Sequence, residues 1–271
     1  NCTFDIKSSL RDRIEKIKEE AAIAVREGSN NLILSDKKIS SSCASIPSVL
    51  TVGAVHSHLV KLGLRGYCSI NVESSDVLDT HSFVVLIGVG ATTVNPYLAI
   101  DSIYQRFEKK LFGNSDFESC VAKFKKSIDD GLLKIMSKMG ISVISSYRGG
   151  CNFEAVGLSR AIVSDYFPGM SSRISGIGIG GIEKKIKEHY KNFISNSVTT
   201  LPIGGIYRYR KTGEQHQFQG SLIHVLQHAV GTGSYDSYKK YSKGIHDLPP
   251  ISLRDLLEFK TKKDSININE V

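Results

Sequence analysis

Tryptophan is absent from this 271-residue chain, and so are the features that mark membrane and secreted proteins. The longest apolar run, Phe83 to Gly90, is far shorter than the roughly 20 residues that a membrane-spanning helix needs. No charged segment followed by an apolar one opens the chain, as a secretory signal would. We therefore expect neither a membrane partner nor secretion.

Cysteine is scarce, and its spacing carries no signature. The five cysteines are odd in number, lie far apart and form no Cys-x-x-Cys pair. This argues against a disulfide framework and against a zinc site, and it favours a reducing compartment. We expect a cytoplasmic protein in which Cys2, Cys43, Cys68, Cys120 and Cys151 are scattered thiols.

Lysine and arginine outnumber aspartate and glutamate by 35 to 27, which gives a net charge of +8. A basic chain raises the possibility of a nucleic-acid partner. However, the lysines occur as spaced pairs among acidic residues, such as Lys109-Lys110 and Lys184-Lys185. No basic stripe interleaved with aromatics, helix-turn-helix or zinc finger accompanies them. We interpret the charge as a solvated surface and expect no nucleic-acid partner.

Strand-like and helix-like patterns alternate along the chain up to Ser195. Strands separated by helices predict parallel pairing, because a parallel crossover requires a dozen or more residues. The spacing fits both an open doubly wound sheet and an incomplete (β/α) barrel, so the predicted fold class is α/β. The predicted strands are residues 31–34, 68–72, 91–94 and 141–145, and the predicted helices are residues 10–27, 49–62, 76–87, 96–110, 117–139 and 182–193.

The composition changes at the polar stretch Ser195-Asn196-Ser197, where we place a boundary between residues 1–197 and residues 198–271. Beyond it, residues 205–218 predict a hairpin that turns at residues 211–213. Helical patterns follow, so the second region is expected to be mostly helical. These patterns cover residues 221–230, 234–242 and 253–259.

The run Gly176 to Gly181 has the spacing Gly-x-Gly-x-x-Gly before a predicted helix, which is the pattern of a phosphate-binding loop. Two requirements of that motif fail. Residues 170–175 make a poor buried strand, and no acidic residue stands about 20 positions further on. We interpret the run as a turn before a helix.

The histidines form no metal motif. His56 and His58 lie two apart on one predicted helix and therefore on different faces. His224 and His228 share a face but lack the glutamate of a His-Glu-x-x-His site, and His216 stands apart from them. We expect surface or interface histidines and no metal site. No Gly-x-Ser-x-Gly elbow is present, and no catalytic residue is assigned.

Two loops are dense in small and polar residues: residues 88–97, and residues 145–154 directly after the predicted strand 141–145. Loops at the carboxyl ends of parallel strands face the functional side of a sheet or barrel. Tight turns in which glycine permits close packing explain the composition equally well. The candidate site residues are Gly90, Thr92, Asn95, Tyr97, Tyr147, Arg148, Gly149 and Asn152.

The same loops carry a resemblance. Residues 90–99 (GATTVNPYLA), 131–150 (GLLKIMSKMGISVISSYRGG) and 152–163 (NFEAVGLSRAIV) resemble the central domain of the glutamate synthase large chain. Residues 32–37 and 52–65 resemble it as well, and residues 204–218 and 251–259 resemble the lead-in to that enzyme's FMN-binding synthase domain. The segments SYRGG (residues 146–150) and NFEAVGLSRA (residues 152–161) resemble the bacterial NADPH-dependent form of the enzyme more than the ferredoxin-dependent form.

The resemblance implies an enzyme in which different domains carry out different steps of the reaction. In that family, a cysteine at the start of a glutaminase domain releases ammonia from glutamine. The ammonia passes through an internal tunnel to 2-oxoglutarate at the FMN site, where the imine is reduced to glutamate. Electrons arrive through iron–sulfur clusters, and in the NADPH type they come from a small subunit that carries FAD and binds NADPH.

The resemblance further implies that this chain is a fragment of such an enzyme, inactive alone and without a bound cofactor. Residues 1–197 would be the central domain, which connects the glutaminase and FMN domains of the same chain and helps to wall the ammonia tunnel. Its fold in the family resembles an incomplete (β/α) barrel, and residues 198–271 would begin the FMN-binding domain. The two loops would face the glutaminase or synthase domain.

Two other interpretations remain open. The chain could be a non-catalytic binding or assembly module. It could also be a stand-alone flavin or nucleotide enzyme, which would need the Gly176 to Gly181 loop to hold phosphate.

Overall fold

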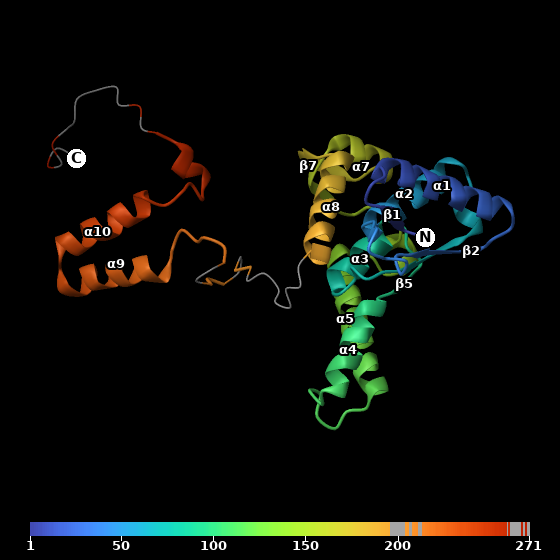
Figure 1. Ribbon diagram of the computed structural model, residues 1–271, viewed down its shortest axis with the longest axis horizontal. Coiled ribbons are helices and arrows are strands. Elements are labelled where there is room, and N and C mark those ends of the chain that lie inside the picture. The colour runs from blue at the N-terminus through green and yellow to red at the C-terminus, as the bar shows by residue number, and fades with distance from the viewer. Residues whose placement is uncertain are drawn as a thin grey trace. The chain divides into compact units, whose positions relative to one another are not determined.

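The computed structural model describes residues 1–195, 204–205, 208–210, 213–258, 260, 267 and 269 (Figure 1). The chain divides into two compact units, Asn1–Asn196 and Ser197–Val271. The first unit mixes helices with parallel strands, and the described part of the second is helical.

A three-stranded parallel sheet stands at the centre of the first unit. Its strands β2 (Asn31–Ser35), β4 (Ser69–Glu73) and β5 (Thr93–Asn95) lie in the order β2-β4-β5. β4 pairs with β2 along its whole length, and Asn71–Glu73 of β4 pair with Thr93–Asn95 of β5. Alternate residues of a strand point to one face, and here that face is apolar and buried. It carries Leu32, Leu34, Ile70 and Val72.

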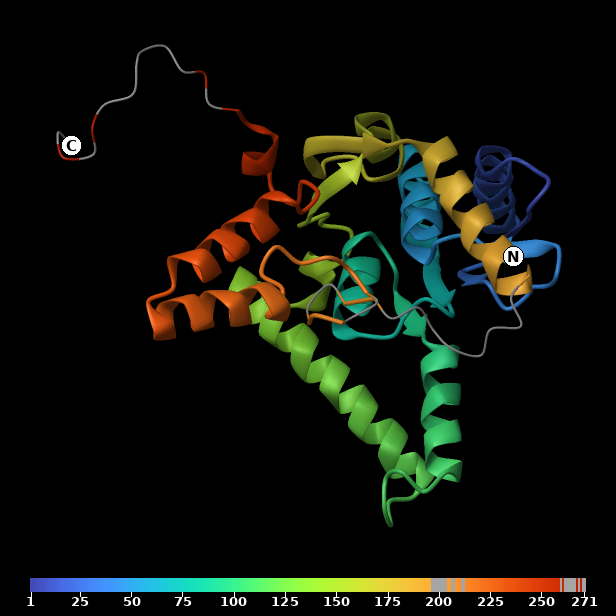
Figure 2. The same cartoon turned by 60° about the vertical axis from the view of Figure 1, so that its left-hand side comes forward.

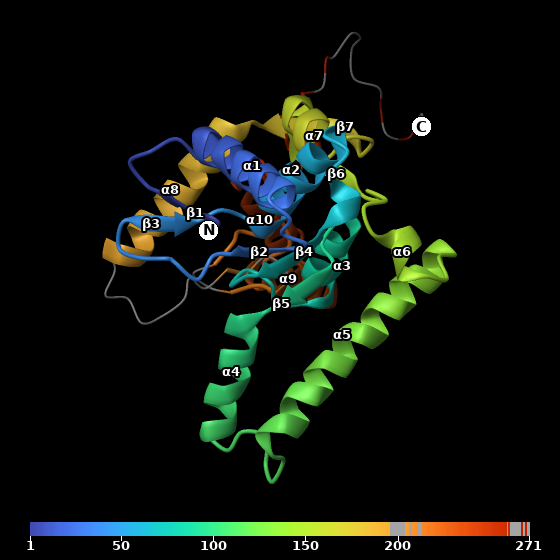
Figure 3. The same ribbon diagram turned by 90° about the vertical axis from the view of Figure 1, so that its right-hand side faces the viewer.

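Helices connect these strands and cover the buried face of the sheet, which confirms the predicted α/β class and its parallel pairing. α1 (Leu10–Arg26) precedes β2, α2 (Ser48–Lys61) and the short 3-10 turn η1 (Arg65–Tyr67) lead to β4, and α3 (Thr80–Gly88) leads to β5 (Figure 3). In the described part of the chain the strands close into no barrel. α3 begins four residues later than predicted because the Asp79 side chain accepts a hydrogen bond from Ser82 N and caps the helix there.

A two-stranded antiparallel sheet was not predicted. β1 (Thr3–Asp5) pairs with β3 (Cys43–Ser45). Three residues are too few to show an alternation of apolar and polar side chains, so the sequence carries no strand signal there. Phe4 is 2% exposed and joins β1 to the main core.

α4 (Tyr97–Glu108) and α5 (Phe117–Met139) form an arm that projects from the rest of the first unit (Figures 2 and 3). The bounds of α5 match the prediction, because the Asp116 side chain accepts from Ser119 N at one end and Gly140 adopts a left-handed φ of 72° at the other. The Phe117 ring meets the Tyr104 ring edge-on with centroids 5.5 Å apart, which joins the two helices.

The strand predicted at residues 141–145 is wrong. The segment is irregular up to Val143, and α6 (Ile144–Tyr147) then forms one helical turn. A helical turn places Ile144 and Tyr147 on one side, where they pack with Val84 and Met136 in a small second core. This packing stabilises a helical turn over an extended segment that has no partner strand.

A second parallel pair was also missed. β6 (Glu154–Leu158) pairs with β7 (Ser171–Ile177) across α7 (Arg160–Tyr166), so the segment that was expected to make a poor buried strand is a strand, but not a buried one. β7 is exposed along most of its length, and its hydroxyl-rich sequence lacks the pattern of a buried strand. Gly176 lets the two strands approach closely, because a Cβ there would collide with the Gly157 carbonyl. α8 (Ile179–Ser195) follows directly.

The described part of the second unit contains α9 (Gly220–Thr232) and α10 (Tyr235–His246), which pack against each other. Gly233 is left-handed, with a φ of 63°, and Ser234 caps α10. The helix predicted at residues 253–259 is only the 3-10 turn η2 (Leu253–Leu256). The turn of the predicted hairpin, at residues 211 and 212, lies outside the described residues.

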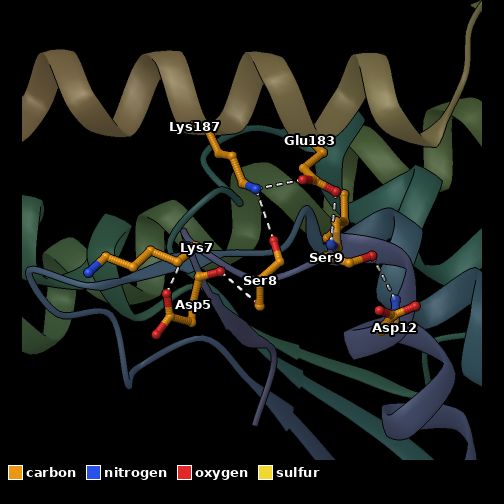
Figure 4. Close-up of polar contacts among 8 residues, drawn as sticks. Asp5, Lys7, Ser8, Ser9, Asp12, Glu183 and Lys187 are labelled. Atoms are coloured by element: carbon orange, nitrogen blue, oxygen red, sulfur yellow. Dashed lines mark hydrogen bonds and ion pairs between the residues drawn. The ribbon is translucent and has the colours of Figure 1, made fainter.

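α8 is fastened to the start of α1 by a carboxylate (Figure 4). Glu183 Oε2 accepts a hydrogen bond from Leu10 N at 2.9 Å, although the two residues are 173 positions apart. Lys187 Nζ donates to Glu183 Oε1 at 2.5 Å and to the Ser8 carbonyl at 2.9 Å. The first N–H groups of a helix lack partners within it, so Glu183 satisfies one of them and places negative charge at the positive end of the helix.

Replacing Glu183 with Ala should lower the free energy of unfolding by about 1–2 kcal/mol, because a helix cap and an ion pair are lost together. The Lys187 and Leu10 hydrogen bonds hold the pKa of Glu183 below its ordinary value of 4.5. The carboxylate therefore stabilises the fold above pH 4.5, and this contribution is lost as the pH falls through the folded-state pKa. Urea denaturation at several pH values measures the difference.

Glu188→Ala, on the exposed side of the same helix, is the matched control and should leave stability nearly unchanged. The assignment is contradicted if both variants lose the same stability, or if the Glu183 effect persists undiminished in acid.

Candidate functional site

The eight candidate residues do not gather in one place. β5 runs through the middle of the predicted loop 88–97, so Gly90 and Thr92 precede this strand whereas Asn95 is its last residue and Tyr97 follows it. The second loop follows α6 and not a strand. The expectation that both loops lie after strands is therefore wrong, and the candidates divide between the two ends of the β2-β4-β5 sheet.

At the carboxyl end of the sheet, Asp36 is the centre of a hydrogen-bond network. This residue directly follows β2 and is only 2% exposed. Its carboxylate accepts from Ser75 N at 2.9 Å and from the Tyr97 hydroxyl at 2.9 Å. The Ser45 and Ser75 hydroxyls donate to it at 3.2 and 2.7 Å, and the Ser74 hydroxyl, which donates to Asp76 at 2.6 Å, lies 3.1 Å from it.

These contacts give a buried carboxylate the partners that it requires. They join the ends of β2 and β4 to β3 and α4, which are distant in sequence. Burial and the hydrogen bond to Asp36 raise the pKa of Tyr97 to about 12, so its hydroxyl stays protonated and donates at neutral pH. We interpret this network, the Asp36 cluster, as a rigid structural centre and not as an acid–base pair.

Charged side chains border the Asp36 cluster. Lys37 Nζ lies 2.7 Å from Glu73 Oε1 and 5.2 Å from the centre of the Tyr97 ring. Asn95 Nδ2 donates to the same Glu73 carboxylate at 3.3 Å. Despite these acidic residues, no group of three or more His, Cys, Asp or Glu side chains in the described part of the chain could hold a metal ion.

At the amino end of the sheet, Arg65 connects three segments. Its Nε donates to His56 Nδ1 at 3.0 Å, and its two terminal nitrogens donate to the carbonyls of Cys68 and Gly90 at 2.5 and 2.9 Å. α2, the segment before β4 and the turn before β5 are thereby held together. Burial and the neighbouring Arg65 charge lower the pKa of His56 to about 4, so the imidazole is neutral at pH 7.

The two predicted loops meet at the His56 ring. Gly90 has a φ of 123°, and a Cβ there would collide with the imidazole. Gly149 has a φ of 70°, and a Cβ there would lie 3.2 Å from His56 Nε2. Gly149 N also donates to the Ile87 carbonyl at 3.2 Å. Both glycines are therefore required by close packing and by left-handed backbone geometry.

The remaining candidates differ in their surroundings. Thr92 Oγ1 accepts from Ile70 N at 3.1 Å and so belongs to the sheet. Tyr147 is fully buried, with its ring edge-on to Phe153 at 6.2 Å, and its hydroxyl has no partner among the described residues. Asn152 is exposed beside Gly150.

Sequence reasoning selected the glycines of this site but missed Asp36, Arg65 and the role of His56. His56 is half-buried and contacts both loops, a role that the expectation of surface or interface histidines did not specify, whereas His224 and His228 are exposed. No spacing links Arg65 to Gly90 or Asp36 to Tyr97, because only the pairing of the strands brings them together.

A family model described as the glutamate synthase central domain matches residues 1–159, which is more than half of the chain. The chain belongs to the glutamate synthase central domain family. The structure of this central domain confirms the α/β alternation that the resemblance implied. In the described part of the chain, no helix is both long enough and apolar enough to span a bilayer.

Curated relatives agree with this family. The chain is 52% identical over 263 residues to the glutamate synthase [NADPH] large chain of Azospirillum brasilense, covering 97% of this chain and 17% of that protein. It is 38% identical to the Bacillus subtilis glutamate synthase [NADPH] large chain, with coverage of 98% and 17%. It is 36% identical to the ferredoxin-dependent glutamate synthase of Pyropia yezoensis, with coverage of 98% and 18%. The chain thus spans less than a fifth of each of these relatives.

Asp36→Asn should lower the free energy of unfolding by about 1–2 kcal/mol, because the amide keeps only one of the two acceptor oxygens and loses the charge that strengthens the remaining hydrogen bonds. Asp101→Asn, an equivalent change at an exposed position of α4, is the control and should have little effect. Urea denaturation followed by circular dichroism compares the two. Equal stability of the two variants would show that the Asp36 cluster is not a structural centre.

Gly149→Ala and Gly63→Ala form a matched pair, since both glycines have a φ of 70° but only Gly149 faces another side chain. The left-handed backbone costs about 1–2 kcal/mol in each variant. Contact with His56 should add about 1 kcal/mol at Gly149 alone. Thermal and urea unfolding measure the difference, and identical losses would mean that the imidazole does not restrict Gly149.

Proposed function

We propose that this chain is part of the large chain of an NADPH-dependent glutamate synthase. The single observation that carries the proposal is the 52% identity to the Azospirillum brasilense glutamate synthase [NADPH] large chain over 97% of this chain. The identity to the ferredoxin-dependent relative is lower, at 36%. We assign residues 1–197 to the central domain and residues 198–271 to the start of the FMN-binding synthase domain.

The complete enzyme would make L-glutamate from L-glutamine and 2-oxoglutarate by reductive amination, in the assimilation of ammonia. We assign FMN and the iron–sulfur cluster to parts of the large chain outside these residues, and FAD and NADPH to a small subunit. The five cysteines of this chain are all free and scattered, so they do not suit an iron–sulfur cluster. Such free thiols fit a reducing compartment, and we place the enzyme in the cytoplasm.

Within that enzyme, this region would connect the glutaminase domain to the FMN domain and help to wall the ammonia tunnel. Its partners would be those two domains of the same chain. The loops that contain Gly90 and Gly149 would face one of them. Support comes from their packing around His56, which holds both backbones in fixed left-handed turns. A tunnel wall needs this rigidity, because a mobile loop would let ammonia escape or water enter.

The direct test uses the complete large chain purified with its small subunit. Glutamine and 2-oxoglutarate together should drive NADPH oxidation and glutamate formation, whereas the 271-residue chain alone should show neither. A complete, folded enzyme that oxidises no NADPH with these substrates would overturn the proposal.

A variant of that enzyme tests the role of the loops. Gly149→Val should displace the turn around His56 and raise the ratio of ammonia released to glutamate formed. Gly63→Val, with the same φ but no facing side chain, should leave that ratio unchanged. Unchanged coupling in a folded Gly149→Val enzyme would refute a role of this loop in the tunnel wall.

A further inference from the structure

An apolar groove lies between α8 and β3 in the first unit. The helix contacts the strand and lies beside it (Figure 3). Ala44 and Pro47 line the groove on the side of β3, and Ile182, Ile186 and Phe193 line it on the side of α8. Its volume is about 610 Å³. The groove is therefore large enough to take several side chains of a partner.

The apolar side chains of α8 are only partly used by the fold. Ile182, Ile186 and Tyr190 pack against the main core but also line the groove. Phe193, one turn beyond Tyr190, is 77% exposed, and the centres of the two rings are 6.4 Å apart. Burying such a side chain stabilises a protein by about 1.5–3 kcal/mol. An apolar groove that continues to an exposed phenylalanine is typical of a surface that another segment covers.

The charge beside the groove is positive. Lys185 and His189 line it, and no acidic residue does. Both glutamates of α8 form ion pairs with other lysines of the same helix. Lys185 takes part in none of the ion pairs found in the described part of the chain. A partner that complements this groove therefore presents an acidic group together with apolar side chains.

Both walls of the groove are held in place by contacts described above. On the side of β3, Ser45 lines the groove and its hydroxyl donates to the buried Asp36 at 3.2 Å. On the other side, Glu183 fastens α8 to the start of α1 through Leu10 N. The groove is thus formed before a partner arrives, which reduces the entropic cost of binding.

We propose that this groove, the α8 groove, is the docking surface for a segment of the same large chain outside these 271 residues. The chain covers 17% of the Azospirillum brasilense relative, so more than four-fifths of such a large chain is available, and this source rests on the function proposed above. The segment would place apolar side chains between α8 and β3 and an Asp or Glu beside Lys185. A protein segment is favoured over a small ligand, because sites for small ligands bury about 70–90% of the ligand and a wall that ends in the exposed Phe193 is too open for this.

Photo-cross-linking in the complete large chain, purified with its small subunit, tests the docking. The photoreactive residue p-benzoylphenylalanine replaces Phe193, and mass spectrometry identifies the peptides joined to it after irradiation. The main cross-link should join position 193 to a segment of the same chain outside these 271 residues, and that segment should contain Asp or Glu among apolar residues. The same replacement at Lys184, an exposed position of α8 that does not line the groove, is the control and should not cross-link to that segment.

A cross-link from position 193 to the small subunit, to a second copy of the large chain or to residues 1–271 would overturn the proposal, and so would the absence of any cross-link. Lys185→Glu should lower the yield of the expected cross-link severalfold, because it places like charges together, whereas Lys184→Glu should leave the yield unchanged. Equal yields in the two variants would contradict the acidic contact. These outcomes do not depend on NADPH oxidation, so they fail separately from the proposed function.

Discussion

The buried carboxylate of Asp36 is the interaction on which the rest of the first unit depends. A charge that is 2% exposed is tolerated only when hydrogen bonds replace its water, and here the donors come from three separate segments. Tyr97 begins α4, so the arm formed by α4 and α5 starts from this centre. The hydrogen bonds to this one carboxylate therefore hold the ends of the strands and the start of the arm in fixed positions. They act in addition to the apolar packing of the sheet.

At the amino end of the sheet, the central group is a cation, the Arg65 guanidinium. Arg65 binds two carbonyls and the His56 ring, and that ring in turn restricts Gly90 and Gly149. The two ends differ in the charge at their centre: the Asp36 carboxylate accepts hydrogen bonds from the segments around it, whereas the Arg65 guanidinium donates hydrogen bonds to the segments around it.

The sequence correctly predicted those elements whose ends are determined by nearby residues, and it failed where contacts between distant segments decide the structure. α5 was predicted at its observed bounds, because Asp116 and Gly140 act within a few residues of the ends that they cap. The strand predicted at residues 141–145 was wrong because a short alternating segment also suits one helical turn, and the core around Tyr147 decides between them. β7 was missed because it is exposed. For the site, glycine-rich loops pointed to Gly90 and Gly149, but Asp36 and Arg65 become visible only once distant strands are paired.

The chain belongs to the glutamate synthase central domain family, and we have proposed that this domain connects the glutaminase domain to the FMN domain. A connecting domain of this kind needs a rigid structure at both ends of its central sheet. Native-state hydrogen exchange tests this most directly. Ser75 N donates to the buried Asp36, and Lys7 N makes the same kind of bond to the exposed Asp5 carboxylate at 2.7 Å. The account predicts that Ser75 exchanges as slowly as the amides of β4, through global unfolding, while Lys7 exchanges quickly. Equally rapid exchange at both amides would contradict a rigid centre at Asp36.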